Sequence, residues 1–281
     1  MGYPKTLKAV SRKLTNNIVI ASCGFTRANT LNFGARMALF NYDNDIVVWS
    51  AIPYGDEVVK ALELLTGDNG GVFNITHLVV PDKEHTMAAR SFKSNYPNMK
   101  IIAMETVDLG KDCPIDYTIT SKVGNQLIDK RALSEDIGIQ DSVILNNFEF
   151  VYLPTHANKE LVMFDKNSNI LFEADLLFNL GVPGTTSGKV TLEQFSTSTG
   201  YPKNFKPHLG RSFLTRYLQP NSKVGNCLAR SVTKASNPDT QKGLRAIYNS
   251  WDFEKIVMCH GNIIEKDAKG AFKSVFSSAL E

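Results

Sequence analysis

The stretch Val80-Pro81-Asp82-Lys83-Glu84-His85 closes an apolar run and precedes a predicted helix at residues 86–95. Three side chains that can bind a metal, Asp82, Glu84 and His85, therefore fall at the end of a predicted buried strand. In open α/β sheets, ligands usually bind in the crevice beyond the carboxyl ends of the strands. The stretch thus marks a candidate site, to which other parts of the chain have to contribute.

Three further predicted strands are also followed by a side chain that can bind a metal. They are 148–153 with His156, 170–174 with Asp175, and 255–259 with His260. Imidazole and carboxylate groups are ligands for zinc, iron or manganese, and catalytic sites keep a position open for water. Because these residues are far apart in the sequence, only the fold can bring them together.

The remaining periodicity predicts strands and helices in alternation, typical of an α/β fold. The predicted elements are strands at 18–21 and 100–104, hairpins at 35–51 and 161–174, and helices at 57–66 and 268–280. No strand is predicted before residue 18, and residues 106–141 are interpreted as surface-covering. Residues 181–249 are interpreted as a helical insertion over one end of the sheet. We therefore expect one domain, residues 1–281, that contains this insertion.

Composition indicates an ordinary globular protein. The chain has 281 residues, of which 43% are hydrophobic and 21% charged, and its net charge is only +3. No run of five or six like charges occurs, so we expect neither nucleic acid nor a membrane surface as a partner. A small-molecule substrate is the expected partner, and the oligomeric state is left open.

The lengths of the apolar runs and the spacing of the cysteines indicate where in the cell the protein is expected. The longest apolar runs fall short of the roughly 18 residues that a membrane span needs. The basic N-terminal stretch makes a poor signal peptide. Four cysteines lie far apart without a CxxC pair, which is typical of a reduced intracellular protein. A cytoplasmic location is therefore expected.

Several of these segments together resemble the metallo-β-lactamase superfamily. They are residues 76–85, the Thr155-His156 pair, residues 172–178, and Cys259-His260-Gly261. The resemblance covers residues 18–280, least well in the insertion. It implies an α/β (α+β) fold, specifically a four-layer αββα sandwich with a one- or two-metal site between the sheets.

The resemblance also implies roles for individual residues. The first motif of that superfamily is usually THxHxDH, and superposing its last histidine on His85 puts Glu84 on the aspartate. Asp82 then stands at the second histidine and Val80 at the first. Val80 cannot coordinate a metal, so one of the two sites retains at most Asp82, His156 and a bridging Asp175.

The other implied site consists of Glu84, His85, Asp175 and His260, and it is complete in ligand type. The resemblance therefore implies one well-held metal and a second that is weak or absent. Zinc is expected first, with iron or manganese as alternatives because carboxylates replace histidines, as in the flavodiiron branch.

A subgroup, the DUF4336 proteins, is similar in more detail. The form Pro81-Asp82-x-x-His85, together with Ser50-x-x-Pro53 and Trp251-Asp252-Phe253, resembles this subgroup. In these proteins a proline and a polar residue stand where the superfamily has its histidine pair. The similarity implies the fold more directly than the reaction.

Each candidate residue also has a plain structural interpretation. A histidine at a strand end can simply be satisfied by the backbone. Asp175 can cap a helix or a turn, and Asp82 and Glu84 can serve as first-turn carboxylates at a helix N-terminus. Recurrence at several strand ends favours metal binding for His85 and His260.

The expected function is a metal-dependent hydrolase, in which a metal-bound hydroxide attacks an ester, lactone, thioester or phosphodiester. Asp82, if not a ligand, would accept the proton of the water, and His156 would be a ligand or a transition-state donor. Two alternatives stay open. One is an iron-dependent oxidoreductase resembling the persulfide dioxygenase and flavodiiron branches, and the other is a metal-poor, non-catalytic binding protein with a degenerate site.

Overall fold

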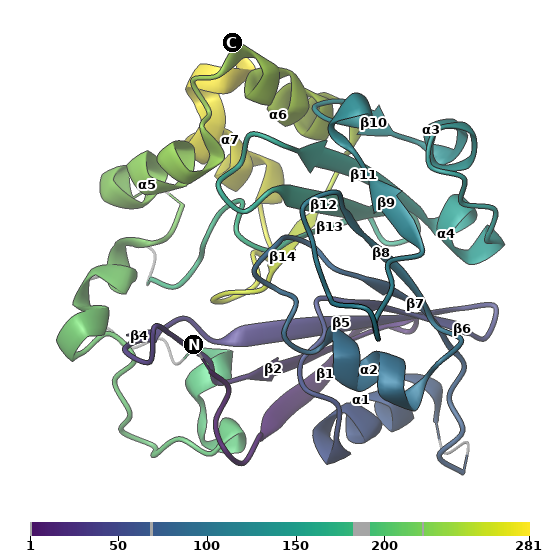
Figure 1. Cartoon of the computed structure of the whole chain (residues 1–281). Coiled ribbons are helices and arrows are strands. Elements are labelled where there is room, and N and C mark those ends of the chain that lie inside the picture. The colour runs from purple at the N-terminus through teal and green to yellow at the C-terminus, as the bar shows by residue number, and fades with distance from the viewer. Residues whose placement is uncertain (1, 68–69, 182–191, 221) are drawn as a thin grey trace.

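Two β-sheets lie face to face, with helices on both outer faces (Figure 1). The computed structural model describes residues 2–67, 70–181, 192–220 and 222–281. Within these residues no helix is both long and apolar enough to cross a membrane. The candidate site lies where several strands of both sheets end.

The first sheet has seven strands in the order β1-β2-β5-β6-β7-β8-β9. Their bounds are β1 (Ala9–Thr15), β2 (Ile18–Cys23), β5 (Ala35–Tyr42), β6 (Asp45–Trp49), β7 (Ile75–Val79), β8 (Lys100–Met104) and β9 (Tyr117–Ile119). Strands β1 to β6 pair antiparallel, whereas β6 to β9 pair parallel. Helices α1 (Asp56–Thr66) and α2 (Ala89–Asn95) provide the crossovers from β6 to β7 and from β7 to β8, and residues 105–116 connect β8 to β9 without a helix.

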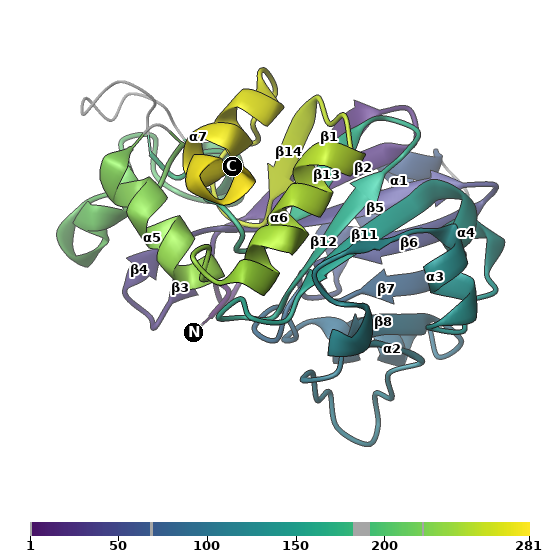
Figure 2. The same ribbon diagram turned by 90° about the horizontal axis from the view of Figure 1, so that it is seen from above.

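The second sheet has five strands in the order β10-β11-β12-β13-β14. Their bounds are β10 (Leu127–Ile128), β11 (Phe148–Leu153), β12 (Glu160–Asp165), β13 (Ile170–Glu173) and β14 (Lys255–Met258). Helices α6 (Pro238–Ser250) and α7 (Ala268–Leu280) cover its outer face, as Figure 2 shows from above. The short helices α3 (Lys130–Glu135) and α4 (Ser142–Asn147) lie at the opposite end from α7.

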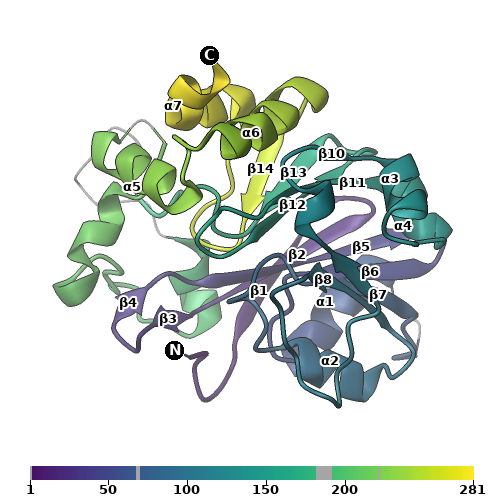
Figure 3. The same cartoon turned by 45° about the horizontal axis from the view of Figure 1, so that its top comes forward.

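Alternation along the strands decides which side chains fill which layer. On β11, Phe148, Phe150 and Tyr152 belong to the core between the sheets, whereas Val151 and Leu153 pack under the outer helices. Successive side chains of a strand point to opposite faces, so a strand covered on both sides is apolar throughout. The layers are thus α, β, β and α (Figure 3), and the expected four-layer sandwich is confirmed.

An aromatic cluster joins the two sheets at the centre of the sandwich. The ring of Phe172 on β13 lies 4.8 Å from that of Phe40 on β5 and 5.7 Å from that of Trp49 on β6. All three side chains are fully buried. Such edge-to-face pairs stabilise a core beyond the area that they bury.

The segment at 181–249 is mixed in structure. Residues 182–191 and 221 lie outside the described part, and the others form the 3-10 helices η2 (Glu193–Phe195), η3 (Thr197–Thr199) and η4 (Gly210–Tyr217), α5 (Lys223–Thr233) and α6. Helix η4 packs against the small hairpin of β3 (Thr26–Arg27) and β4 (Leu31–Asn32). Helix α6 packs on β10, β11 and α7, so it belongs to the outer helical layer.

The structure corrects three sequence-based expectations. Strand β1 lies within the stretch interpreted as strandless, because it is a half-exposed edge strand of mixed polarity. Residues 106–141 contribute strands β9 and β10 and the 3-10 helix η1 (Ser121–Val123), each too short for a periodic signal. The helix expected from Thr86 begins at Ala89, because the Asp82 carboxylate accepts the backbone N–H groups of Glu84 and His85 and holds a turn there.

Replacing Phe172 with alanine is expected to lower the free energy of unfolding by about 3–5 kcal/mol, because a cavity opens between the sheets. Urea unfolding followed by far-UV circular dichroism measures this change. Leu64→Ala on α1, where the side chain is 38% exposed, is the control and should cost about 1 kcal/mol or less. Equal losses in the two variants would contradict the placement of Phe172.

Candidate metal centre

Side chains from three strand ends meet at one point between the sheets. His85 follows β7, Asp175 follows β13 and His260 follows β14, and one ligand atom of each lies within 4.8 Å of the others. His85 Nε2 lies 3.2 Å from His260 Nε2, which lies 3.3 Å from Asp175 Oδ1. The structure therefore brings together three of the residues singled out from the sequence.

The hydrogen bonds on the far side of each ring decide where the ring protons lie. His260 Nδ1 lies 2.7 Å from the carbonyl oxygen of Gly34, which can only accept, so Nδ1 donates. His85 Nδ1 lies 2.8 Å from Asp82 Oδ2 and donates to that carboxylate in the same way. Both Nε2 lone pairs then point at each other, an arrangement that a proton or a cation between them has to stabilise.

Two of the three distances between ligand atoms fit a tetrahedral metal ion. With Zn–N bonds of 2.0–2.1 Å, two ligands of a tetrahedral ion lie roughly 3.3–3.4 Å apart, close to the 3.2 and 3.3 Å found here. Asp175 Oδ1 is buried and has no hydrogen-bond partner of good geometry among the described residues. Two imidazoles and one carboxylate, with a fourth position open, form a donor set typical of catalytic zinc sites.

Buried carboxyl groups around the site also favour a cation. The carboxyl groups of Asp82, Glu160, Glu173 and Asp175 are all at most 1% exposed. Burial raises the pKa of Glu160 well above its usual range, and the neighbouring carboxylates add to the shift. Burial would likewise raise the pKa of Asp175, but the nearby histidines outweigh it and hold that pKa below its ordinary value. Without an opposite charge nearby, Glu160 and Glu173 are therefore held neutral, and a bound cation would stabilise the ionised form of each.

Neighbouring side chains hold the Asp175 carboxylate in place. Glu160 accepts the backbone N–H groups of Ala174 at 2.6 Å and of Asp175 at 3.2 Å. Asn158 Nδ2 donates to Asp175 Oδ2. One carboxylate oxygen is thus occupied by protein, and the other faces the two histidines.

Asp82 and Glu84 lie outside the three converging atoms. Asp82 is fully buried behind His85, and its Oδ1 accepts the backbone N–H of Glu84 at 2.7 Å and of His85 at 2.8 Å. Glu84 forms an ion pair with Arg27 at 2.7 Å. Val80, at the position where the superfamily motif has its first histidine, is buried in the apolar core.

His156 is buried next to Asp175 and Asp82 but does not belong to the group of three. Its Nδ1 accepts the backbone N–H of Asn158 at 3.1 Å, so the neutral ring carries its proton on Nε2. Burial lowers the pKa of His156 more than the two carboxylates raise it. The ring is therefore a neutral donor at Nε2, and a ligand role would require a different tautomer.

Arg36 on β5 was not singled out from the sequence, although it holds the loop that carries His260. The side chain is fully buried and donates to the carbonyl oxygens of Met258 at 2.6 Å and Gly261 at 2.7 Å. It also pairs with Glu193 at 3.1 Å. A charged residue within an apolar strand was the available signal for this role.

Two glycines allow the close approach of these segments. Gly34 has φ +73°, and a Cβ there would lie 2.5 Å from the side chain of Gln194. Gly261 has φ +88°, and a Cβ there would lie 2.3 Å from the backbone oxygen of Asn179. Larger residues would be strained at both positions and would displace the carbonyl or the loop that orients His260.

Cys259 lies behind the site, beside His85 and Ser50. Its Sγ lies 2.9 Å from Ser50 Oγ. Burial raises the pKa of this thiol to about 11, although His85 acts in the opposite direction. Cys259 is therefore a protonated thiol that packs against the site.

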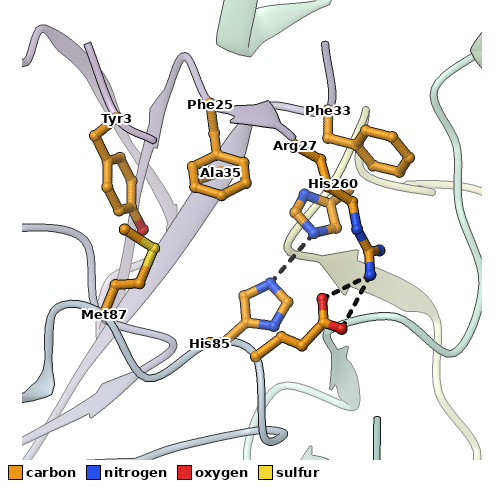
Figure 4. Close-up of a pocket in the computed structure, with 9 residues that line it drawn as sticks. Tyr3, Phe25, Arg27, Phe33, Ala35, His85, Met87 and His260 are labelled. Carbon is orange, nitrogen blue, oxygen red and sulfur yellow. Dashed lines mark hydrogen bonds and ion pairs between the residues drawn. The ribbon is translucent and has the colours of Figure 1, made fainter. Parts of the chain in front are cut away.

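A pocket opens over the two histidines and is walled mainly by apolar and aromatic side chains (Figure 4). The lining residues are Tyr3, Phe25, Arg27, Phe33, Ala35, Glu84, His85, Met87 and His260. Its volume, open mouth included, is about 460 Å³. The ring of Phe33 lies 5.4 Å from that of His260, and the ion pair of Arg27 with Glu84 forms a polar part of the wall.

Comparison with solved structures places this fold among the metallo-β-lactamases. The enzyme of Erythrobacter litoralis aligns with a TM-score of 0.58 and 8% identity over 99% of both chains. DIM-1 aligns with 0.55 and 12% identity over 99% of this chain and 100% of that one. FIM-1 of Pseudomonas aeruginosa, in its mono-zinc form, aligns with 0.53 and 10% identity over 98% and 96%.

Sequence comparisons add no closer relative. No protein-family model matches the chain, and no curated protein sequence matches it. At 8–12% identity, the likeness to these enzymes defines the fold. The chemistry has to be argued from the site itself.

Arg36→Met is expected to lower the free energy of unfolding by about 3–5 kcal/mol, because it removes one of the two arginines that pair with the largely buried Glu193 carboxylate and the donor to two carbonyl oxygens. Denaturant unfolding measures the loss. Arg131→Met removes an 81% exposed arginine that pairs with Glu135, so it is the matched control and should cost about 1 kcal/mol or less. If both variants lost similar amounts of unfolding free energy, Arg36 would not hold the His260 loop as the structure indicates.

The Arg36–Glu193 pair should also make stability depend on pH. Burial would raise the pKa of Glu193, but Arg36 and Arg12 outweigh it and hold the pKa below its ordinary value. The pair therefore contributes fully above the unfolded-state pKa, and the contribution is lost as pH falls through the lower native pKa. The stability difference between wild type and Glu193→Gln should stay constant from pH 7 to about 5 and shrink below that. A difference that does not change between pH 7 and 3 would contradict this expectation.

Proposed function

We propose that the protein is a metal-dependent hydrolase with one divalent cation held by His85, Asp175 and His260. The observation that carries the proposal is the convergence of two Nε2 atoms, whose rings already donate from Nδ1, on an unpartnered buried carboxylate oxygen. Without a further proton on one of the rings, protein atoms alone leave three lone pairs facing one another. A cation resolves this repulsion and balances the buried carboxylates.

Zinc is the cation that the donor set supports first. Histidine nitrogen and carboxylate oxygen at tetrahedral spacing suit zinc, and iron or manganese accept the same ligands. FIM-1, which shares the fold at 10% identity, has been solved in a mono-zinc form. The apolar Val80 and the donor tautomer of His156 both reduce the ligands available to a second ion.

A bound divalent cation supplies a Lewis acid and lowers the pKa of a water molecule to about 7. The protein's own groups would supply the rest. Asp82 fixes the tautomer and orientation of His85, and the Gly34 carbonyl does the same for His260. His156 keeps a neutral donor beside Asp175. In this proposal Asp82 orients a ligand, because its oxygens are already occupied by three donors.

The pocket supports a small-molecule substrate with an apolar or aromatic group. Phe25, Phe33 and Met87 would exclude water from the scissile bond, which strengthens electrostatic interactions there. An ester, lactone, thioester or phosphodiester would place its polar centre over the two histidines. The Arg27–Glu84 pair would give the wall a polar contact for the remainder of the substrate.

Protein purified without chelator or metal-affinity tag is expected to contain close to one equivalent of zinc, iron or manganese by elemental analysis. His85→Ala and His260→Ala should each lose it, because each removes a ligand. Asp82→Asn should weaken metal binding by about 10- to 100-fold, as loss of a ligand's hydrogen-bond partner usually does. Glu84→Gln is the matched control and should retain the metal, since Glu84 pairs with Arg27.

Two assays then separate the alternatives. Hydrolysis of ester, thioester and phosphodiester reporters that is lost with the metal supports the proposal. Iron content with oxygen consumption and no hydrolysis would instead indicate an oxidoreductase. Metal-free protein of normal stability, with no gain in thermal stability on zinc addition, would overturn the metal site and favour a non-catalytic binding protein.

A further inference from the structure

Basic charge is concentrated in one segment of the chain. Between Glu193 and Asp239 the sequence has no acidic residue and seven basic ones. They are Lys203, Lys206, Arg211, Arg216, Lys223, Arg230 and Lys234. The whole chain has 31 basic and 28 acidic residues, so the remainder holds 24 and 28. The segment thus has a charge of +7 and the rest of the protein −4.

Five of these basic side chains form no ion pair with any residue that the structure describes. Lys203, Lys206, Arg211, Lys223 and Lys234 are exposed. None of the five makes an ion pair with a carboxylate in the described part of the chain. Their field is therefore directed into solvent, screened only by salt.

The same segment exposes large apolar side chains. Among the described residues, five of the eight exposed large hydrophobic side chains belong to it. They are Leu209 (62% exposed), Phe213 (47%), Leu214 (69%), Val224 (59%) and Leu228 (44%). In η4, with three residues per turn, the row of Ser212 and Thr215 is buried, so the other two rows face outward.

Helix α5 presents its apolar and basic residues on one face. Val224 and Leu228 lie one turn apart, whereas the opposite face, with Asn226, Ala229 and Thr233, is buried against the protein. Lys223 lies beside them on the exposed face. We name the exposed faces of η4 and α5, with Lys203 and Lys206, the basic–apolar surface.

This surface lies at one end of the molecule, beside the pocket. Figures 1, 2 and 3 all place α5 and the helical stretch before it at the end opposite α3 and α4. Ser212 of η4 accepts the backbone N–H of Asn32 at 2.9 Å, and Asn32 Nδ2 donates to the Pro207 carbonyl at 2.9 Å. The hairpin that these bonds hold also carries Arg27 of the pocket wall.

We propose that the basic–apolar surface docks the protein on an anionic lipid bilayer. Exposed Leu, Phe and Val side chains beside unpaired Lys and Arg match helices that lie in the membrane interface, where apolar groups enter the headgroup boundary and basic groups contact anionic headgroups. A second copy of the chain is disfavoured, because a symmetric contact sets like charges against each other. Nucleic acid is disfavoured as well, because its phosphates would contact the basic side chains but would not bury the exposed apolar ones.

This docking does not depend on the proposed metal site. It also differs from the sequence-based expectation of no membrane partner, which rested on the lack of consecutive like charges. Here the basic residues are spread over 32 positions, from Lys203 to Lys234, and the fold places this segment at one end of the molecule. Isolated charges along the chain can therefore form one electrostatic surface.

Flotation of the full-length protein with vesicles tests the proposal. Phosphatidylcholine vesicles that contain phosphatidylserine should carry the protein, vesicles of phosphatidylcholine alone should carry much less, and high salt should release it because screening shortens the reach of each charge. The triple variant Lys206→Glu, Arg211→Glu and Lys223→Glu should bind at least about tenfold more weakly.

Control variants make the same kinds of substitution outside the basic–apolar surface. The matched charge control, Lys13→Glu with Lys111→Glu and Lys122→Glu, alters exposed residues outside the segment and should bind like wild type.

Leu214→Ser should weaken binding, whereas Val72→Ser, at a 78% exposed position, should not. Lack of binding to anionic vesicles, equal loss in both charge triples, or a wild-type dimer that Leu214→Ser dissociates would each overturn the proposal. Size-exclusion chromatography with light scattering measures the last of these.

Discussion

The contact between two imidazole nitrogens 3.2 Å apart is the constraint on which the site depends. Each ring has its Nδ1 proton committed to an acceptor behind it, Asp82 for His85 and the Gly34 carbonyl for His260. Neither ring can therefore turn its proton toward the other without losing a buried hydrogen bond. A bound cation would satisfy both nitrogens and the Asp175 oxygen at once.

Residues of both sheets position these two imidazole rings. The first sheet supplies His85. At the start of its strand β5, the Gly34 carbonyl accepts the Nδ1 proton of His260, and Arg36 binds the backbone of the loop that carries His260. The second sheet supplies His260 and Asp175 from adjacent parallel strands. Because the first sheet orients His260 of the second, the site requires the closed sandwich, and the aromatic cluster between the sheets supports it indirectly.

Charge is distributed unevenly in this molecule. Carboxylates are gathered around the candidate metal centre and are buried, whereas unpaired basic groups lie on the surface of one end. The first arrangement favours a cation in the interior, and the second favours an anionic partner outside. The net charge of +3 reveals neither arrangement, because it adds up buried carboxylates and surface basic groups that lie far apart in the structure.

Local patterns in the sequence determined most of the fold, because apolar runs with a period of two or 3.6 report which faces are buried. They predicted the strands that end near His85, Asp175 and His260 and the closing helix at 268–280. They did not predict β1, whose polar edge has no such pattern. Only the tertiary structure decided that Asp82 lies behind His85, that Glu84 pairs with Arg27, and that Arg36 reaches the His260 loop. Those contacts join residues distant in sequence, and the geometry of packing, rather than residue type, selects among several chemically reasonable partners.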